Sequence, residues 1–363
     1  MITALLVIAI LVVLIVAHEL GHFIAAKIFK VRVEEFGVGY PPRAFLFGKI
    51  GETEYTFNWL PFGGFVRLFG DEGEKQHGSG SFVDAPRHVQ ALILVAGVLA
   101  NAIVAWGLFA GALALGIPRV LDSKSTNENA HLVVADVVAG SPAEAAGIAS
   151  GDEIVSVRDE SGSELAVPTP DTVMDFVRSR AGKQIFVTYE RAGTTTVAAL
   201  RPAHAVISDN VGMPAIGVAL VLVSTDPLSA TDALKESFYR TKDAFKQVGG
   251  GLWTILRGVL AGKPNLSDVV GPVGLVGVVS DAATHGFANV LALAGFISVN
   301  LAIINLIPIP ALDGGRLLLL AIETVSRRKA PHILIQILNL LGVVLIAILM
   351  ITVTYQDIAR LFS

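Results

Sequence analysis

The chain has 363 residues, of which 53% are hydrophobic and only 16% are charged, whereas about a quarter of a typical globular protein is charged. These proportions exclude a disordered chain, a collagen and a disulfide-stapled mini-protein. The net charge of −4 gives no reason to expect nucleic-acid binding. Cysteine is absent, so any metal must be held by histidine, carboxylate or amide side chains. We therefore expect a membrane protein with the lipid bilayer as a partner and no nucleic acid.

Long uncharged runs predict four transmembrane helices, because a helix needs about 20 apolar residues to cross a bilayer. The first run continues through a polar His-Glu pair and lacks the basic start and the cleavage site of a signal peptide. The four expected spans are residues 1–28, 87–117, 285–315 and 332–355, with a tail at 356–363.

Lysine and arginine side chains gather in two of the connecting segments, 29–86 and 316–331. The positive-inside rule places such segments in the cytoplasm. We therefore expect both termini, and the long segment between the second and third spans, to lie outside the cytoplasm.

Three stretches outside the spans have patterns of their own. Residues 31–69 alternate as β-strands between glycines, which predicts a small sheet at the cytoplasmic end of the helices, followed by a loop. Residues 118–222 are expected to form a compact extracytoplasmic domain with its flanks. The region 223–284 contains an amphipathic pattern over 227–260 that predicts a helix lying at the membrane interface.

The sharpest motif is His18-Glu19-Leu20-Gly21-His22. Positions i and i+4 share one face of a helix, so both imidazoles point toward one spot, and Glu19 lies beside them as a general base for the attacking water. The motif follows 16 residues without charge, where burying an acid costs roughly 2.5–3.5 kcal/mol. Zinc binding explains that cost, whereas a chance pair of histidines does not.

A catalytic zinc site has three protein ligands and one open position. Asp313 is the only acid at a membrane depth similar to that of the two histidines. Pro308 and Pro310 break the helix just before it, and unwound backbone at this depth is tolerated only beside protein or a water-filled cavity. The alternative is a helix end facing solvent. With the histidine pair present, we expect Asp313 to be the third ligand.

Three amides and one glycine in the spans remain to be interpreted. Asn305 lies eight residues before Asp313. Its amide could donate to a developing oxyanion or to substrate backbone, or it could bridge two helices, and the sequence leaves both open. We interpret Asn101 and Asn300 as packing amides, and Gly97 as a point where two helices approach closely.

In combination and order, these motifs resemble the site-2 protease family, in particular the bacterial zinc metalloproteases of the regulator-of-sigma-E protease type. The similar segments are His18–His22, Phe36–Pro42, Leu60–Val66, Gly271–Gly274 and Asn305–Gly315. The resemblance implies that His18, His22 and Asp313 bind Zn²⁺, that Glu19 is the general base and that Asn305 contacts substrate. Leu60–Val66 is similar to the family's membrane-associated β-hairpin. We expect its Gly63 and Gly64 to contact an unwound substrate strand that pairs with the sheet edge.

Residues 130–203 resemble a bacterial PDZ domain, on the runs Val138–Ile148 and Gly151–Val155. Such a domain could bind an extended peptide at a sheet edge, or act as a steric filter against bulky substrate ectodomains, and the sequence favours neither. The chain carries one such domain where the sigma-E-type proteases have two, and Arg316 where they often have histidine. The expected fold class is an α-helical integral membrane protein with four transmembrane helices, a small membrane-associated β-sheet and an inserted α+β PDZ domain.

The resemblance implies an intramembrane zinc metalloprotease of the bacterial inner membrane. It would cut within or next to the transmembrane helix of single-span membrane proteins, such as anti-sigma factors or signal-peptide remnants. One alternative is a non-catalytic, PDZ-bearing scaffold with a structural metal site, although structural zinc is more often closed by four ligands. The other is a transporter with broken helices, although no inverted repeat relates the four spans.

Overall fold

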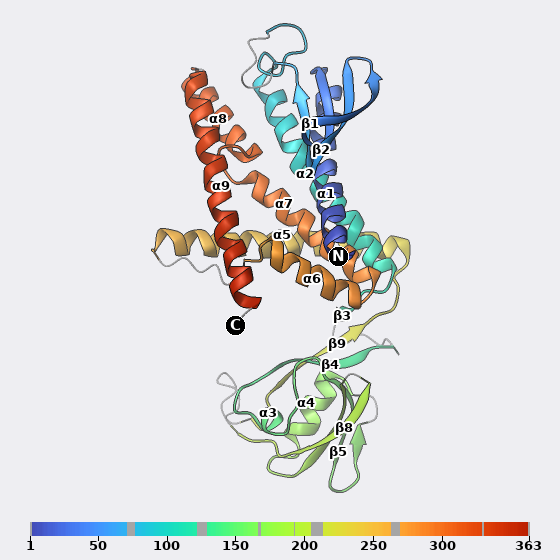
Figure 1. The fold of residues 1–363 in the computed structure, drawn as a ribbon. Coiled ribbons are helices and arrows are strands. Elements are labelled where there is room, and N and C mark those ends of the chain that lie inside the picture. Colours follow the sequence, from blue (N-terminus) through green and yellow to red (C-terminus); the bar gives the residue numbers. More distant parts are fainter. Residues whose placement is uncertain are drawn as a thin grey trace. The chain divides into compact units, whose positions relative to one another are not determined.

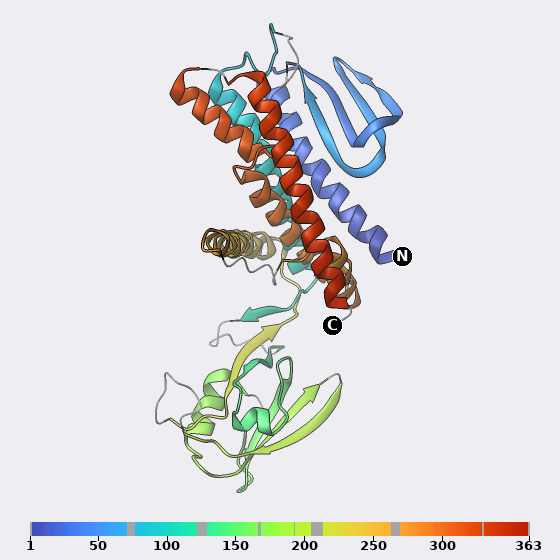
Figure 2. The same ribbon diagram turned by 60° about the vertical axis from the view of Figure 1, so that its left-hand side comes forward.

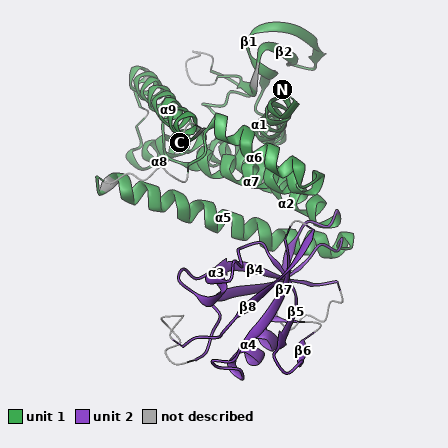
Figure 3. Cartoon of the chain, turned by 60° about the horizontal axis from the view of Figure 1, so that its bottom comes forward, with its two compact units in different colours: residues 1–114, 228–363 green, residues 115–227 purple. Residues whose placement is uncertain are grey.

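The computed structural model describes residues 2–70, 77–121, 129–165, 168–191, 193–204, 213–262, 269–328 and 330–361. The chain divides into two compact units, which Figure 3 shows in different colours. Unit 1 contains residues 1–114 and 228–363, and unit 2 contains residues 115–227.

Unit 1 contains the apolar helices. Within the described residues, four are long and apolar enough to cross a membrane, which confirms the predicted number of spans. They are α1 (Ile2–Ile28), α2 (Arg87–Ala114), α7 (Phe287–Leu306) and α9 (His332–Leu361). Helix α2 packs against both α1 and α7, whereas most described side chains of α9 are exposed, as expected of a helix that faces lipid.

The third span ends earlier than the sequence analysis expected. Helix α7 stops at Leu306, a non-helical stretch follows, and a new helix, α8 (Asp313–Ser326), begins at the acid. The expected span to residue 315 and the expected loop at 316–331 are therefore corrected. Pro308 and Pro310 lack the backbone N–H of a helix and disfavour helical conformation in the preceding residue, and an acid suits the first turn of the helix that restarts.

The predicted sheet of unit 1 is a long antiparallel hairpin of β1 (Val33–Ile50) and β2 (Thr53–Leu68) that packs against α1. Irregularities in the register curl the hairpin back on itself. The first part of β1 pairs on one side with residues 54–57 and on the other with residues 64–68. The segment 64–68 therefore lies at an outer edge, where no further strand pairs with it among the described residues.

The outer part of the hairpin is apolar and exposed, while its inner part holds a buried carboxylate. Exposed aromatic side chains include Tyr40, Phe45, Phe47 and Trp59. Glu35 is buried and accepts hydrogen bonds from the Arg43 guanidinium and the Thr56 hydroxyl. These contacts hold the curled hairpin together, while its exposed aromatic groups suit the boundary between water and lipid.

Helix α5 (Ala230–Leu260) begins at the Ser229 N-cap and lies crosswise to the spanning helices of unit 1 in Figures 1 and 2. Ala244 on this helix packs into a cluster with Phe109 and Val299, while Phe238 and Trp253 are exposed. This arrangement matches the amphipathic helix predicted from the sequence.

A buried acid connects the last span to the short helix α6 (Pro272–Thr284). Asp357 near the end of α9 accepts the backbone N–H groups of Gly271 and Gly274, at 3.2 and 2.8 Å. These donors have no partner within a helix N-terminus, so the carboxylate caps α6 and attaches the largely exposed α9 to it.

Unit 2 is an α+β domain, as predicted. Its seven-stranded sheet has the order β3-β9-β4-β5-β7-β8, with β6 paired to β5. The strands are β3 (Arg119–Leu121), β4 (His131–Val137), β5 (Glu153–Asp159), β6 (Glu164–Leu165), β7 (Ile185–Arg191), β8 (Thr194–Leu200) and β9 (Val218–Ser224). Helices α3 (Pro142–Ala145) and α4 (Pro170–Arg178) pack on its core.

The turn at Gly151 and Asp152, at the start of the run Gly151–Val155, is held by the Asp152 carboxylate. Asp152 is buried, accepts the backbone N–H of Ala149 and pairs with Arg191 at 2.6 Å. The Arg191 guanidinium lowers the pKa of the Asp152 carboxyl below its ordinary value. The ionised acid therefore fixes the turn against β7 across the neutral pH range.

Candidate metal and catalytic centre

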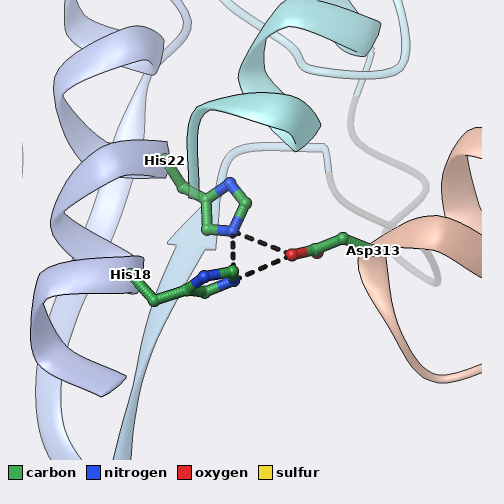
Figure 4. A group of neighbouring side chains, drawn as sticks. All are labelled: His18, His22 and Asp313. Atoms are coloured by element: carbon green, nitrogen blue, oxygen red, sulfur yellow. Dashed lines mark hydrogen bonds and ion pairs between the residues drawn. The ribbon is translucent and has the colours of Figure 1, made fainter. Parts of the chain in front are cut away.

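The two imidazoles of the first span point to the same place, and the carboxylate of Asp313 meets them there (Figure 4). Nε2 of His18 and Nε2 of His22 lie 3.1 Å apart. Oδ2 of Asp313 lies 2.9 Å from the His18 nitrogen and 3.2 Å from the His22 nitrogen. Both imidazoles are buried, and the Asp313 side chain is 17% exposed.

These three side chains have the donor set of a catalytic zinc site. Their ligand atoms lie within 4.8 Å of one another, and the described residues add no fourth histidine or carboxylate to the group. Two imidazole nitrogens and one carboxylate oxygen, with a fourth position open, are characteristic of zinc hydrolases rather than of structural zinc. The residues present therefore fit a zinc ion.

The position of Asp313 depends on how α8 is held. Leu320 of α8 is buried in a cluster with Ile93 of α2, and Glu323 pairs with Arg87 at the start of α2, at 2.8 Å. With α8 fixed against α2 in this way, its first turn lies opposite the histidine face of α1. The helix break before Asp313 is what allows the chain to bring the acid back to this depth.

The backbone of α2 orients His22. Nδ1 of His22 lies 2.8 Å from the carbonyl oxygen of Ile93. A carbonyl oxygen only accepts, so Nδ1 must carry the proton and donate it, which leaves the lone pair of Nε2 directed toward Asp313 and His18.

Gly97 of α2 leaves the space that the imidazoles occupy. A Cβ atom at this position would overlap Nε2 of His22 and lie 2.7 Å from Nε2 of His18. The sequence analysis interpreted Gly97 as a point of close helix approach, and the structure shows that the groups approaching it are the two imidazole rings.

Glu19 lies next to the hairpin at Gly64. A Cβ atom added to Gly64 would lie 3.5 Å from Cγ of Glu19, and one added to Gly63 would lie 2.9 Å from the ring of Tyr40. Electrostatic interactions also connect Glu19 with His18, His22 and Asp313. The acid therefore lies between the three convergent side chains and the inner end of the hairpin edge.

The amides differ in where the structure places them. Nδ2 of Asn305 lies 3.3 Å from Nε2 of His18, so this amide is at the site, whereas Asn300 donates to the carbonyl of Phe296 within its own helix. Sequence reasoning missed Asn101, which we interpreted as a packing amide. Its Nδ2 lies 3.3 Å from Nδ1 of His18. No signal in the sequence separates this amide from a packing amide.

Membrane-spanning helices around a buried His-His-Asp group define a membrane-embedded metalloenzyme. Comparison with known proteins specifies the family: the chain matches the model of Peptidase family M50 over residues 6–349. The chain belongs to this family, the site-2 protease family of metallopeptidases.

Curated relatives agree over nearly the whole chain. A relative from Clostridium perfringens is 35% identical over 347 residues, covering 95% of each chain. One from Clostridium acetobutylicum is 33% identical over 356 residues, covering 97% of each. Zinc metalloprotease RasP from Shouchella clausii is 29% identical over 431 residues, covering 99% of this chain and all of the relative. The chain is a zinc metalloprotease of the membrane, as predicted.

One solved structure also resembles part of the chain. It is the PDZ domain of an SdrC-like protein from Listeria monocytogenes, which is 21% identical, covers 27% of this chain and 92% of its own, and has a TM-score of 0.21.

Replacing Gly97 with alanine should lower the zinc affinity of the full-length protein in detergent by roughly tenfold or more. The added methyl group would displace at least one imidazole from the point where the three side chains converge. Competition with a chromophoric chelator measures the affinity. Gly107→Ala, on the same helix, is the matched control, because a Cβ atom added at Gly107 would meet nothing within 4 Å. Equal affinities for both variants would contradict the interpretation of Gly97.

Proposed function

We propose that this zinc metalloprotease hydrolyses a peptide bond within or next to the transmembrane helix of single-span membrane proteins, with His18, His22 and Asp313 as the zinc ligands and Glu19 as the general base. One observation carries the proposal. Asp313 lies 295 and 291 residues from the two histidines in the sequence, yet its carboxylate meets both imidazoles among membrane-spanning helices. Burying ionisable groups in a membrane segment is costly, and such groups are characteristic of functional sites.

The chemistry follows from the positions of the chain's own groups. Bound zinc supplies a Lewis acid that lowers the pKa of water and polarises the scissile carbonyl. Glu19 accepts the proton of the attacking water and delivers it to the leaving amine. The amide of Asn305, 3.3 Å from the His18 ring nitrogen, is in reach of the same space, where its N–H can donate to the developing oxyanion or to the substrate backbone.

The hairpin provides a way to hold the substrate. Carbonyl groups of a transmembrane helix are hydrogen-bonded within that helix, so the substrate must unwind before hydrolysis. The free edge of residues 64–68 begins at Gly64, beside Glu19. An unwound strand that pairs with this edge passes next to the general base and contacts the backbone of Gly63 and Gly64.

Replacing Glu19 with glutamine should lower the rate of cleavage of a membrane-embedded reporter by about 10²–10⁴-fold, because glutamine cannot accept the proton. Zinc content should stay unchanged, since Glu19 is not among the three convergent side chains. Reconstituted full-length protein and metal analysis measure both quantities, with Glu52→Gln on the exposed hairpin turn as the control.

A wild-type rate for Glu19→Gln would contradict the general-base assignment. A protein that binds zinc and cleaves no embedded reporter, with or without Glu19, would favour the scaffold alternative.

We also propose that the hairpin and α8 lie on the cytoplasmic side of the membrane, and that unit 2 and both termini lie outside the cytoplasm. The distribution of lysine and arginine supports this orientation.

Single cysteines can test the orientation, because the natural chain has none. Glu160→Cys in unit 2 should react with a membrane-impermeant maleimide on intact spheroplasts, whereas Lys49→Cys in the hairpin should react only after lysis. Both side chains are exposed in the structure, so access to the reagent depends on the side of the membrane. The reverse pattern of labelling would overturn the proposed topology.

A groove in unit 2 supports peptide binding over simple size filtering. It has a volume of about 240 Å³ and is lined by Val173, Met174 and Val177 of α4, and by Ile216, Val218 and Leu220 of the facing segment. Beside it, β4 is the only described strand that pairs with residues 218–221 of β9, because the described part of β3 pairs with β9 over residues 222–224. An extended peptide can therefore add to this strand and place side chains in the groove.

Replacing Met174 with tryptophan should fill the groove and raise the KM for a substrate that carries its extracytoplasmic segment. Val197→Trp is the control, because Val197 is also exposed but lies on β8 and does not line the groove. Cleavage kinetics of the full-length enzyme measure the effect. If Met174→Trp changes nothing while shortening the substrate ectodomain speeds cleavage, unit 2 acts as a size filter.

A further inference from the structure

The side chain of Asn101 lies directly behind one of the proposed zinc ligands. It is fully buried on α2, one turn after Gly97, with its Nδ2 3.3 Å from Nδ1 of His18. Its other end, the carbonyl oxygen Oδ1, is buried and has no hydrogen-bond partner. A buried polar atom without a partner costs about 1–3 kcal/mol, so this one requires an explanation.

The proton on His18 supplies the explanation. If Nε2 of His18 binds zinc, its ring proton is on Nδ1, which is then a hydrogen-bond donor. The Nδ2 group of Asn101 is also a donor, so two donors would face each other. The two ends of a carboxamide have nearly the same shape. Rotating the amide by half a turn places Oδ1 against the Nδ1–H group, which replaces the meeting of two donors by a hydrogen bond. Nδ2 then takes the position that Oδ1 held.

We propose, on the basis of the function proposed above, that Asn101 is a positioning residue whose Oδ1 accepts the Nδ1–H hydrogen bond of His18. This bond holds the ring in the tautomer and orientation that direct the lone pair of Nε2 to the metal. Helix α2 then orients both ligating rings, because the carbonyl of Ile93 accepts from Nδ1 of His22 in the same way. One ring is fixed by the backbone of α2 and the other by a side chain two turns further along.

Helix packing alone does not account for the amide. The contact between Asn101 and α7 is made by its backbone, since the Ser298 hydroxyl donates to the Asn101 carbonyl oxygen at 2.8 Å. The side chain takes no part in this bond. Among the described residues, its one hydrogen-bond partner is the imidazole of His18.

Two substitutions separate an acceptor from a packing group. Asn101→Leu keeps the volume and removes the acceptor, so zinc affinity should fall by about 10–100-fold. Asn101→Asp keeps an oxygen acceptor and should bind zinc within about threefold of the wild type, because a carboxylate is a common partner of zinc-bound histidine. Chelator competition on the full-length protein in detergent gives the affinities, and the d–d spectrum of the cobalt-loaded protein reports ligand geometry. Asn300→Leu is the matched control, since that amide donates to the Phe296 carbonyl within its own helix, its one partner among the described residues.

Each outcome decides the proposal. Similar affinities for Asn101→Leu and Asn300→Leu, or equal losses for Asn101→Leu and Asn101→Asp, would overturn it. If Asn101→Leu does not fold, a measurement on the wild-type protein tests the proposal instead. ¹⁵N-histidine labelling of the zinc-loaded protein should show a slowly exchanging Nδ1–H proton on His18. Fast exchange of this proton would overturn the proposal. His18→Ala tests the underlying function separately. If that variant keeps full zinc affinity, the ligand assignment itself has failed.

Discussion

The meeting of Asp313 with His18 and His22 is the contact on which the rest of unit 1 depends. Two imidazoles and a carboxylate inside a bundle of apolar helices are costly unless each has a partner. The ligand atoms of the three side chains lie within 3.2 Å of one another, and a bound zinc ion would be the partner that their lone pairs share. Each major deviation from a plain helix bundle serves this contact: the proline break before the acid, the restart of the chain as α8 and the missing side chain at Gly97.

Helix α2 is the central support of the site, although it contributes none of the three convergent side chains. It packs against α1 and α7, is joined to α8 by the Arg87–Glu323 ion pair, and leaves room for both rings at Gly97. Its Ile93 carbonyl also bonds His22. A ligand is useful only if its ring orientation is fixed before the metal arrives, and that orientation comes from groups that never touch the metal.

The sequence predicted those features of the site that are set by local spacing or by depth in the membrane. The two histidines are four residues apart on one helix, so their convergence follows from helix geometry, and Asp313 was the only acid at a suitable depth. The contact of Asn101 could not be predicted in this way, because it depends on how α2 is rotated about its own axis against α1. A packing amide and an amide bonded to a ligand look the same in one sequence.

The same limit explains the corrections to the fold. The segment 316–331 was expected to be a loop, since its arginines mark the cytoplasmic side, but charge distribution determines orientation and not secondary structure. Helix α8 forms there because Leu320 finds a buried position against α2. Likewise, alternation predicted strands over 31–69, while the curl that places residues 64–68 at an edge depends on register shifts, which no single-residue pattern predicts.

The break between α7 and α8 and the free edge of the hairpin both concern backbone in the membrane that lacks helical hydrogen bonds. Backbone without helical hydrogen bonds is tolerated in a membrane only where protein or water satisfies it. The enzyme meets this requirement for its own residues 307–312 partly through bonds such as that from the Ala311 N–H to Oδ1 of Asn339 on α9. In the proposed function, a substrate strand opened for hydrolysis has the same requirement, and the edge at 64–68 would offer it backbone partners beside Glu19. A bundle closed by regular helices alone could protect a metal in the membrane but would offer no unpaired backbone to receive a peptide.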